Sequence, residues 1–428
     1  MIASDMATAG RRWLASAVCA VVALAACATA NSQQFALKDG ETVVFYGDSI
    51  TAQRLYTRFV EDFVVTRYPA LHIRFVNAGV GGDTVNGGYA GGMNERVQRD
   101  VAPFQPAMIT VMLGMNDGGW GYGNSETDAN FQKGYRALLD ALRKADPGVA
   151  LTLIAPTPYD EITHGTEFPG YSRMIDKLAD DVSGVGAQMQ AAGDKNVLVV
   201  DFHHPMMDAL ERAKAQFPEL APLIAPDRIH PSETGHWIMA AALMSAWHVN
   251  PLVSSVALDA VTAKVIDKNR TTVTNAEKST DGLRWTQLDD ALPLPLDFNN
   301  AMTPVLLGIS NIAALDQMMV RIEALEPGQY ELRIDGKDVA GFSREELQHG
   351  VNLALYKTPM LEQARGVDGN EERRATLDLA RFILSAEVKQ GAASGIAEAE
   401  LREAQDEFAA MIRKDLDPKP HHFELRRK

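Results

Sequence analysis

The stretch FYGDSIT at residues 45–51 decides how the first half of this chain is organised. Residues 42–46 are apolar and predict a short buried strand, Gly47 permits a tight turn, and residues 51–68 carry apolar side chains at helical spacing. Ser49 therefore falls between the end of a strand and the start of a helix. There its hydroxyl is exposed, and nearby backbone N–H groups can face a developing negative charge. A plainer interpretation is that Asp48 and Ser49 only cap the helix.

Strand-like apolar runs alternate with amphipathic helical stretches between residues 41 and 250, which predicts a parallel sheet covered by helices. Ligands bind at the carboxyl ends of the strands in such sheets. Ser49 follows one of these ends, and the Gly-rich loops at 79–93 and 114–125 follow two others. The expected strands are 42–46, 73–76, 108–113, 151–154 and 197–200, and the expected helices are 51–68, 95–101, 130–145, 171–192, 206–216 and 232–247.

The pattern changes after residue 250 to short β-like pieces, at 253–258, 318–322 and 330–334. Turn signals separate such pieces, among them Asp335-Gly336, which favours a tight hairpin. We therefore predict a small β-rich, sandwich-like module over residues 251–357. Ser343 with Glu346 forms a capping-box pattern, and Thr358-Pro359 predicts another helix start. Residues 358–428 are expected to be a helical segment in which 377–387 and 398–413 form a terminal helical hairpin.

The composition indicates a folded protein of more than one unit, with 428 residues, 46% of them hydrophobic and 23% charged. Its formal charge of −15 argues against nucleic acid or an anionic membrane surface as a partner, because both bind clustered Lys and Arg. A neutral or cationic substrate is compatible with this charge.

Residues 1–30 resemble an export signal, with Arg11-Arg12 followed by an apolar run and then small residues. The sequence LAAC ending at Cys27 resembles the bacterial lipobox, in which the cysteine is lipidated. Ordinary cleavage at Ala28-Thr29-Ala30 is an alternative, and the paired arginines are also compatible with a twin-arginine route. We expect a periplasmic or outer-membrane-anchored lipoprotein that contacts membrane only through Cys27. The second cysteine, Cys19, also lies in this segment, so the mature chain has no internal disulfide.

Four blocks in residues 31–250 resemble the SGNH branch of the GDSL hydrolases, in that family's order. They are GDS at 47–49, NAGVGGDT at 77–84, GMND at 114–117 and DRIHP at 227–231. The resemblance covers about half of the chain. It implies a three-layer, flavodoxin-like α/β domain and a serine esterase that works without a metal or organic cofactor, which the signal-like segment would place outside the cytoplasm.

Ser49 needs a base to take its proton, and a carboxylate must hold that base in the right tautomer. Asp227 and His230 lie three residues apart before a helix, so they can reach each other locally and leave one ring nitrogen for Ser49. The resemblance implies the same roles. Asp201, at a strand end, competes for the role of the acid, but we interpret it as a structural contact. No tight pair of metal ligands such as His-Glu-x-x-His is present, so we predict no metal.

The resemblance also assigns an oxyanion hole to the Ser49 N–H, the Gly82 N–H and the side-chain amide of Asn116. Gly79 and Gly81 crowd the same loop, but alignment on the Gly-Asp-Thr block selects Gly82.

The two loops beside Ser49 carry Tyr89, Trp120 and Tyr122 among many Gly and Asn residues. Aromatic faces with polar donors suit a sugar ring, whereas few aliphatic side chains are present to bind a long acyl chain. We predict removal of short acyl groups, notably acetyl, from a small carbohydrate or a polysaccharide. Alternatively, these three aromatic side chains only pack the loops and do not contact the substrate. A lysophospholipase or thioesterase, an acyltransferase and a non-catalytic sugar-binding surface lipoprotein are the other functions compatible with the sequence.

Overall fold

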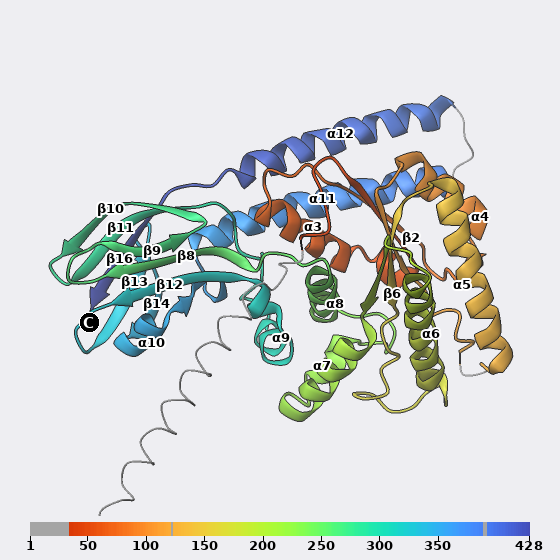
Figure 1. The fold of residues 1–428 in the computed structure, drawn as a ribbon, viewed down its shortest axis with the longest axis horizontal. Helices are drawn as coiled ribbons and strands as arrows, with labels where there is room; N and C mark the ends of the chain where they lie inside the picture. The colour runs from red at the N-terminus through yellow and green to blue at the C-terminus, as the bar shows by residue number, and fades with distance from the viewer. Residues whose placement is uncertain (1–33, 121–122, 388–391) are drawn as a thin grey trace, which may run out of the picture. The chain divides into compact units, whose positions relative to one another are not determined.

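The computed structural model describes residues 34–120, 123–387 and 392–428 (Figure 1). Its first half contains a parallel five-stranded sheet in the order β2-β1-β5-β6-β7. This is the strand order of flavodoxin-like sheets, so the predicted fold class is confirmed. The strands are β1 (Thr42–Gly47), β2 (Arg74–Gly79), β5 (Met108–Met112), β6 (Ala150–Ala155) and β7 (Val197–Asp201).

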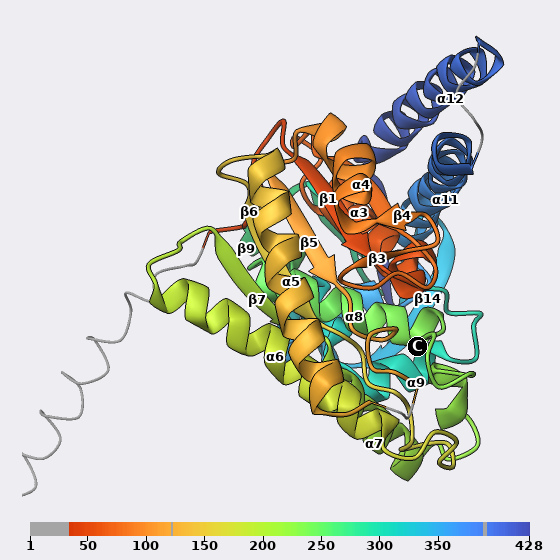
Figure 2. The ribbon, with the colours of Figure 1, turned by 90° about the vertical axis from the view of Figure 1, so that its right-hand side faces the viewer.

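Helices cover this sheet, as predicted. Helices α5 and α6 lie side by side in front of the strands in Figure 2, and α3 packs against α8. No helix in the described ranges has the length and apolar character needed to cross a bilayer. The helices of this half are α2 (Ser49–Ala52), α3 (Leu55–Arg67), α4 (Met93–Arg96), α5 (Ser125–Ala145), α6 (Tyr171–Ala191), α7 (His203–Gln216) and α8 (Glu233–Ala246).

The single helix predicted at 51–68 is two helices. Arg54 has a φ of 63°, in the left-handed region, and this conformation ends α2 before α3 begins. The helix predicted at 95–101 also differs, because α4 continues into a π-helical turn at Val97–Val101. A hydrophobic pattern cannot reveal either irregularity, since the apolar spacing continues across both.

The second half is a sandwich of two sheets, in the orders β10-β11-β16-β13-β14 and β15-β12-β8-β9. Buried side chains of both sheets form one hydrophobic cluster that includes Trp285, Leu332 and Ile322. The β-rich module and the Ser343–Glu346 capping box are therefore confirmed. The elements are β8 (Leu252–Asp259), β9 (Val265–Asn269), β10 (Thr271–Ser279), β11 (Gly282–Asp289), α9 (Thr303–Ile309), β12 (Gln317–Glu323), β13 (Gln329–Ile334), β14 (Lys337–Ser343), α10 (Arg344–His349) and β15 (Val351–Asn352).

The predicted helical hairpin is present as α11 (Pro359–Glu387) and α12 (Ala392–Leu416), but the chain does not end there. A further strand, β16 (His421–Arg427), lies between β11 and β13 in the five-stranded sheet of the sandwich. Phe423 and Leu425 of this strand belong to the hydrophobic cluster. The prediction of a helical end to the chain is therefore wrong, and β16 completes the five-stranded sheet of the β-rich module.

Helix α3 joins the two halves. The guanidinium of Arg67, near its end, lies 2.8 Å from a carboxylate oxygen of Asp316, and both side chains are buried. Arg67 also donates to the carbonyl oxygen of Asn250 at 2.7 Å. Earlier in α3, Glu61 forms an ion pair with Arg374 of α11. The boundary predicted at residue 250 therefore lies inside a network of buried contacts.

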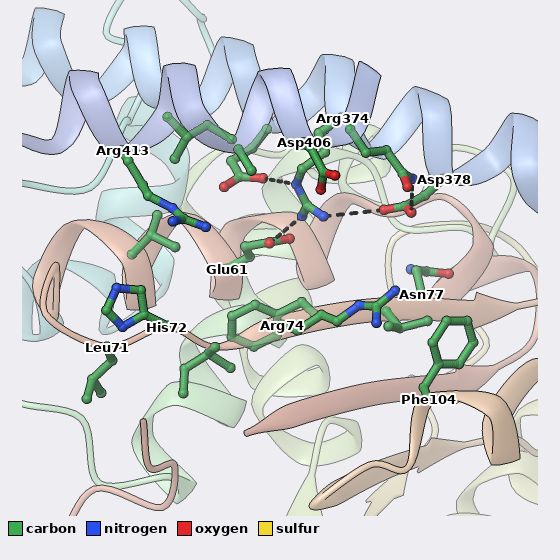
Figure 3. A pocket seen from close by; sticks show the side chains of 18 of the residues that line it. Glu61, Leu71, His72, Arg74, Asn77, Phe104, Arg374, Asp378, Asp406 and Arg413 are labelled. Atoms are coloured by element: carbon green, nitrogen blue, oxygen red, sulfur yellow. Dashed lines mark hydrogen bonds and ion pairs between the residues drawn. The ribbon is translucent and has the colours of Figure 1, made fainter. Parts of the chain in front are cut away.

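A cavity of about 970 Å³ lies between the edge strand β2, helix α3 and the hairpin of α11 and α12 (Figure 3). Arg374 is held there by Glu61, Glu371 and Asp378. Ser49, Asp227 and His230 are not among the residues that line this cavity. The cavity is therefore distinct from the candidate active site.

Candidate active site

Ser49 is the first residue of α2 and directly follows its N-cap, Asp48, at the carboxyl end of β1. The turn requires glycine at position 47, because a Cβ there would lie 2.2 Å from Thr51 Oγ1 and 2.8 Å from the Met112 carbonyl oxygen. Asp48 accepts a hydrogen bond from the Ile50 N–H at 3.0 Å. Capping is therefore done by Asp48, and the Ser49 hydroxyl is left for another partner.

That partner is His230, whose Nε2 lies 2.8 Å from Ser49 Oγ. The other ring nitrogen, Nδ1, lies 2.7 Å from Asp227 Oδ2. Asp227 Oδ1 also accepts the backbone N–H groups of Ile229 at 3.0 Å and His230 at 2.7 Å. A carboxylate can only accept, so this arrangement places the ring hydrogen on Nδ1 and leaves Nε2 free to take the serine proton.

Asp227 remains ionised in this setting. Partial burial by itself raises its pKa, but the hydrogen bonds from the His230 N–H, the His230 ring and the Ile229 N–H outweigh that effect, so its pKa lies below the ordinary value. Arg228, between the acid and the base, has a φ of 70°. Its guanidinium donates to Glu167 at 2.8 Å and to the Gly165 carbonyl oxygen at 3.2 Å. These contacts join the Asp227–His230 turn to the loop that precedes α6.

The competing acid, Asp201, serves a different histidine. Its Oδ1 accepts the N–H groups of His203 at 2.8 Å and His204 at 3.1 Å, and its Oδ2 lies 2.7 Å from His204 Nδ1. His203 instead contacts Asp176 and the Pro156 carbonyl oxygen, both at 3.0 Å. Asp201 therefore holds the start of α7 and has no part in the hydrogen-bond chain that begins at Ser49.

The predicted oxyanion donors lie on the same sheet edge as Ser49, because Gly47 is in register with both Gly79 and Met112. Gly82 has a φ of 70°, whereas Gly81 is not left-handed. Within the described ranges, the Gly82 N–H has no acceptor. Asn116 donates from Nδ2 to the Asp83 carbonyl oxygen at 2.9 Å, which fixes its amide and leaves one N–H hydrogen for a ligand.

Residues outside the predicted site support these loops. Arg96, which is fully buried, forms ion pairs with Asp83 and Asp100 and donates to the Ala78 carbonyl oxygen. Its guanidinium also lies 4.6 Å from the centre of the Tyr46 ring. Arg96 therefore holds the loop that carries Gly82 against β1 and β2. Only the number of charged residues after the Gly-rich block hinted at this support in the sequence.

A buried carboxyl group, that of Asp48, and a partly buried one, that of Asp117, lie close together at the nucleophile turn. Burial raises the pKa of Asp48 to about 7, and the nearby carboxylates of Asp117 and Asp83 act in the same direction. Burial likewise raises the pKa of Asp117 to about 7. Asp117 Oδ1 accepts the Val85 N–H at 3.1 Å, which connects the loops after β2 and β5. Both residues belong to the predicted blocks, but the sequence did not indicate their altered pKa values.

The three aromatic candidates differ in their surroundings. Tyr89 is 72% exposed at the tip of a small hairpin between β3 (Gly87–Gly88) and β4 (Gly91–Gly92). Trp120 stacks on Tyr171, with ring centres 5.0 Å apart, and also contacts Phe168. Its packing role is therefore substantial, as the alternative interpretation expected. Tyr122 lies outside the described residues, as do Cys27 and the whole of the export-like segment.

The part of the chain that the structure describes has no group of three or more His, Cys, Asp or Glu side chains arranged to hold a metal ion.

The matches found by sequence cover the first half of the chain. Residues 45–238 match the model of the GDSL-like Lipase/Acylhydrolase family. An acetylxylan esterase of Geobacillus stearothermophilus is 29% identical over 227 residues, which are 48% of this chain and 93% of that protein. The crystal structure of Axe2, an acetylxylan esterase from the same organism, is 24% identical, and the match covers 50% of this chain and 97% of that one with a TM-score of 0.40.

A structural match extends over both halves. The solved structure of a gut microbial diltiazem-metabolizing enzyme has a TM-score of 0.75 and 23% identity, and the match covers 92% of this chain and 98% of that one. At this identity the similarity concerns the fold alone. It shows that the parallel-sheet half and the β-rich half occur together in another protein.

Proposed function

We propose that this ester-bond hydrolase, whose residues 45–238 match the GDSL-like lipase/acylhydrolase family, removes short acyl groups from carbohydrates. The observation that carries this proposal is the chain of hydrogen bonds from Ser49 through His230 to Asp227, at 2.8 and 2.7 Å. These distances are those of a nucleophile, a base and an orienting acid ready for acyl transfer.

In the proposed reaction, Ser49 Oγ attacks the ester carbonyl carbon while its proton moves to His230 Nε2. The tetrahedral intermediate collapses to an acyl-serine, and His230 returns the proton to the leaving alcohol. Water then attacks the acyl-serine, with His230 again taking and returning a proton, and the carboxylic acid leaves. Asp227 stays ionised throughout and stabilises the imidazolium.

The negative oxygen of each intermediate needs donors that are already in place. We assign this role to the Ser49 N–H, the Gly82 N–H and the remaining Asn116 amide hydrogen. Loss of one such donor typically costs about 3–4 kcal/mol of transition-state stabilisation. The anchoring of Asn116 on Asp83 and of Asp83 on Arg96 supports this assignment, because preorganised donors do not have to reorient during the reaction.

Two observations support a carbohydrate ester as the substrate. Exposed Tyr89 and partly exposed Trp120 lie on the Gly-rich loops after β2 and β5 that also carry Gly82 and Asn116, and an aromatic face suits the apolar face of a sugar ring. The acetylxylan esterase that resembles this domain is named for an acetylated polysaccharide. We therefore propose an acetyl group as the acyl part, with Tyr89, Trp120 and Tyr122 contacting the sugar.

A series of aryl esters of increasing acyl length tests the acyl specificity. We expect kcat/KM to be highest for acetate and to fall steadily toward long chains, because these loops provide little aliphatic surface to remove a long chain from water. A rate that climbs from acetate to long-chain esters would replace this proposal with a lipase-like enzyme.

We also propose that the enzyme is exported, on the basis of residues 1–30. Mass spectrometry of the protein made in a bacterial host with lipoprotein processing tests this proposal. A mature N-terminus at lipidated Cys27 supports the lipoprotein form, and one just after Ala30 supports the secreted form. An intact N-terminus would contradict both.

A further inference from the structure

Gln53 lies one helical turn after Ser49. Its N–H donates to the Ser49 carbonyl oxygen at 3.0 Å, and its φ of −62° is that of a right-handed helix. Side chains of a helix lean toward its N-terminus, so the Gln53 side chain leans back over the turn that carries the nucleophile. Unlike its neighbours Thr51 and Arg54, Gln53 is exposed.

A buried histidine holds this exposed amide. His236 Nδ1 lies 3.1 Å from the Tyr56 backbone nitrogen, whose N–H can only donate. Nδ1 is therefore the acceptor, and the ring hydrogen must be on Nε2. Nε2 lies 2.9 Å from Gln53 Oε1, to which it donates. Burial, with a smaller effect of His230, lowers the pKa of His236 to about 3, so the ring is neutral and this tautomer persists at physiological pH.

The consequence is that the Gln53 amide is oriented. Its carbonyl oxygen accepts from His236, the residue is exposed, and its NH₂ group has no acceptor among the described residues. His236 itself is clamped by stacking on Tyr56, with ring centres 5.9 Å apart and planes 8° from parallel. The hydrogen bond also satisfies the buried N–H of His236, and it fixes the orientation of the Gln53 amide one turn after the nucleophile.

The position of His230 indicates which part of the substrate meets this amide. His230 must return a proton to the leaving alcohol, so the alcohol lies on its side of the scissile bond. His236 follows His230 closely in the chain and is near enough for the charge of His230 to affect it. Two of the three assigned oxyanion donors, Gly82 and Asn116, in contrast come from the loops after β2 and β5.

We propose that Gln53 selects the alcohol part of the substrate by donating a hydrogen bond from Nε2 to a sugar hydroxyl oxygen, with His236 as its positioning residue. This inference rests on the proposed function and adds to it a recognition site for the alcohol. The ligand it implies is an ester whose alcohol carries free hydroxyl groups beside the acylated oxygen.

Two acetate esters measured side by side test the inference. One is an aryl acetate, whose alcohol has no neighbouring hydroxyl, and the other is an acetylated xylo-oligosaccharide. In Gln53→Met, which keeps the length of the side chain, we expect kcat/KM to fall about tenfold on the sugar ester, the loss of one hydrogen bond, and less than twofold on the aryl ester. Gln98→Met, a change at another exposed glutamine, serves as the matched control and is expected to alter neither rate.

The hydrogen bond between His236 and Gln53 predicts a second result. His236→Phe keeps a ring against Tyr56 but releases Gln53, so it should show the same selective loss, and the double variant should lose no more than either single variant. Thermal unfolding of each variant separates this effect from loss of folded protein.

Equal losses on the two esters, no loss on either, or additive losses in the double variant would overturn the role of Gln53 while leaving the proposed function intact. A wild-type enzyme that cleaves the aryl acetate but no hydroxylated acetate would overturn both.

Discussion

Two effects act in opposite directions on the pKa of Asp48, the N-cap of α2 beside the nucleophile. Full burial of its carboxyl group raises the pKa, and the hydrogen bond from the Ile50 N–H lowers it. Its pKa of about 7 lies above the ordinary aspartate value of about 3.9. Between these values the folded protein holds a proton that the unfolded chain has lost. The contribution of this group to stability is therefore fully present below about pH 4 and is lost as the pH rises through about 7.

Replacing this group tests that relation. Asp48→Asn keeps an oxygen that can accept the Ile50 N–H but cannot ionise, so we expect its free energy of unfolding to exceed that of the wild type by a few kcal/mol near pH 8, at about 1.4 kcal/mol per pKa unit. The difference should shrink toward zero near pH 4. Urea unfolding at both pH values measures it, with Asp140→Asn, at an exposed position of α5, as control. A difference that does not depend on pH would show that Asp48 is not protonated in the folded state.

The sequence predicted Ser49, Asp227 and His230 because each lies in a short contiguous block and the acid and base are three residues apart. It did not predict the oriented amide of Gln53. His236 and Gln53 are separated by 183 residues, so their contact exists only once α8 packs against α3. Burial of this kind, which also raises the pKa of Asp48, is a property of the assembled core and cannot be inferred from local pattern.

At the scale of elements, β16 is the strand on which the sandwich depends most directly, because it lies between β11 and β13. Phe423 is 1% exposed and stacks on Trp285 at 5.0 Å. We expect Phe423→Ala to lower the free energy of unfolding by about 3–5 kcal/mol, the usual loss for a large buried aromatic side chain. Chemical denaturation measures this, with His422→Ala, on the exposed face, as control. If Phe423→Ala and His422→Ala both changed the free energy of unfolding only slightly, β16 would not be part of the folded core.

Most strands of the parallel sheet were predictable because their residues are apolar and consecutive. Strand β16 was not, since HHFELRR has only two apolar side chains and its partners lie far earlier in the chain. The split between α2 and α3 was missed for a different reason. It depends on the left-handed conformation of Arg54, which an arginine adopts only under the constraint of its surroundings.

At the scale of the whole molecule, the two halves share α3. Truncation at Asn250 would remove the partners of Arg67 and Glu61 and would expose to water the side of α3 that Asp316 and Arg374 contact. The net stability of a domain is only about 5–15 kcal/mol, so the loss of these buried contacts removes a large part of it. We therefore expect residues 31–250 alone to aggregate, as judged by size-exclusion chromatography of the refolded fragment.

A point variant makes the same test in the full chain. Asp316→Ala should lower the free energy of unfolding by about 3–5 kcal/mol, whereas Glu362→Ala, which removes an exposed pair with Lys337, should change it by less than about 1 kcal/mol. A soluble, fully active fragment of residues 31–250, together with a mild effect of Asp316→Ala, would show that the second half is not required for folding.

The most direct test of the account is acetate release from an acetylated polysaccharide by the purified full-length protein and three variants. We predict that the wild type releases acetate, that Ser49→Ala and His230→Ala lose at least about a thousandfold in rate while remaining folded by circular dichroism, and that Asp201→Ala retains most activity. Failure of the wild type to release acetate from any glycan, or acetate release that survives in Ser49→Ala, would contradict the account.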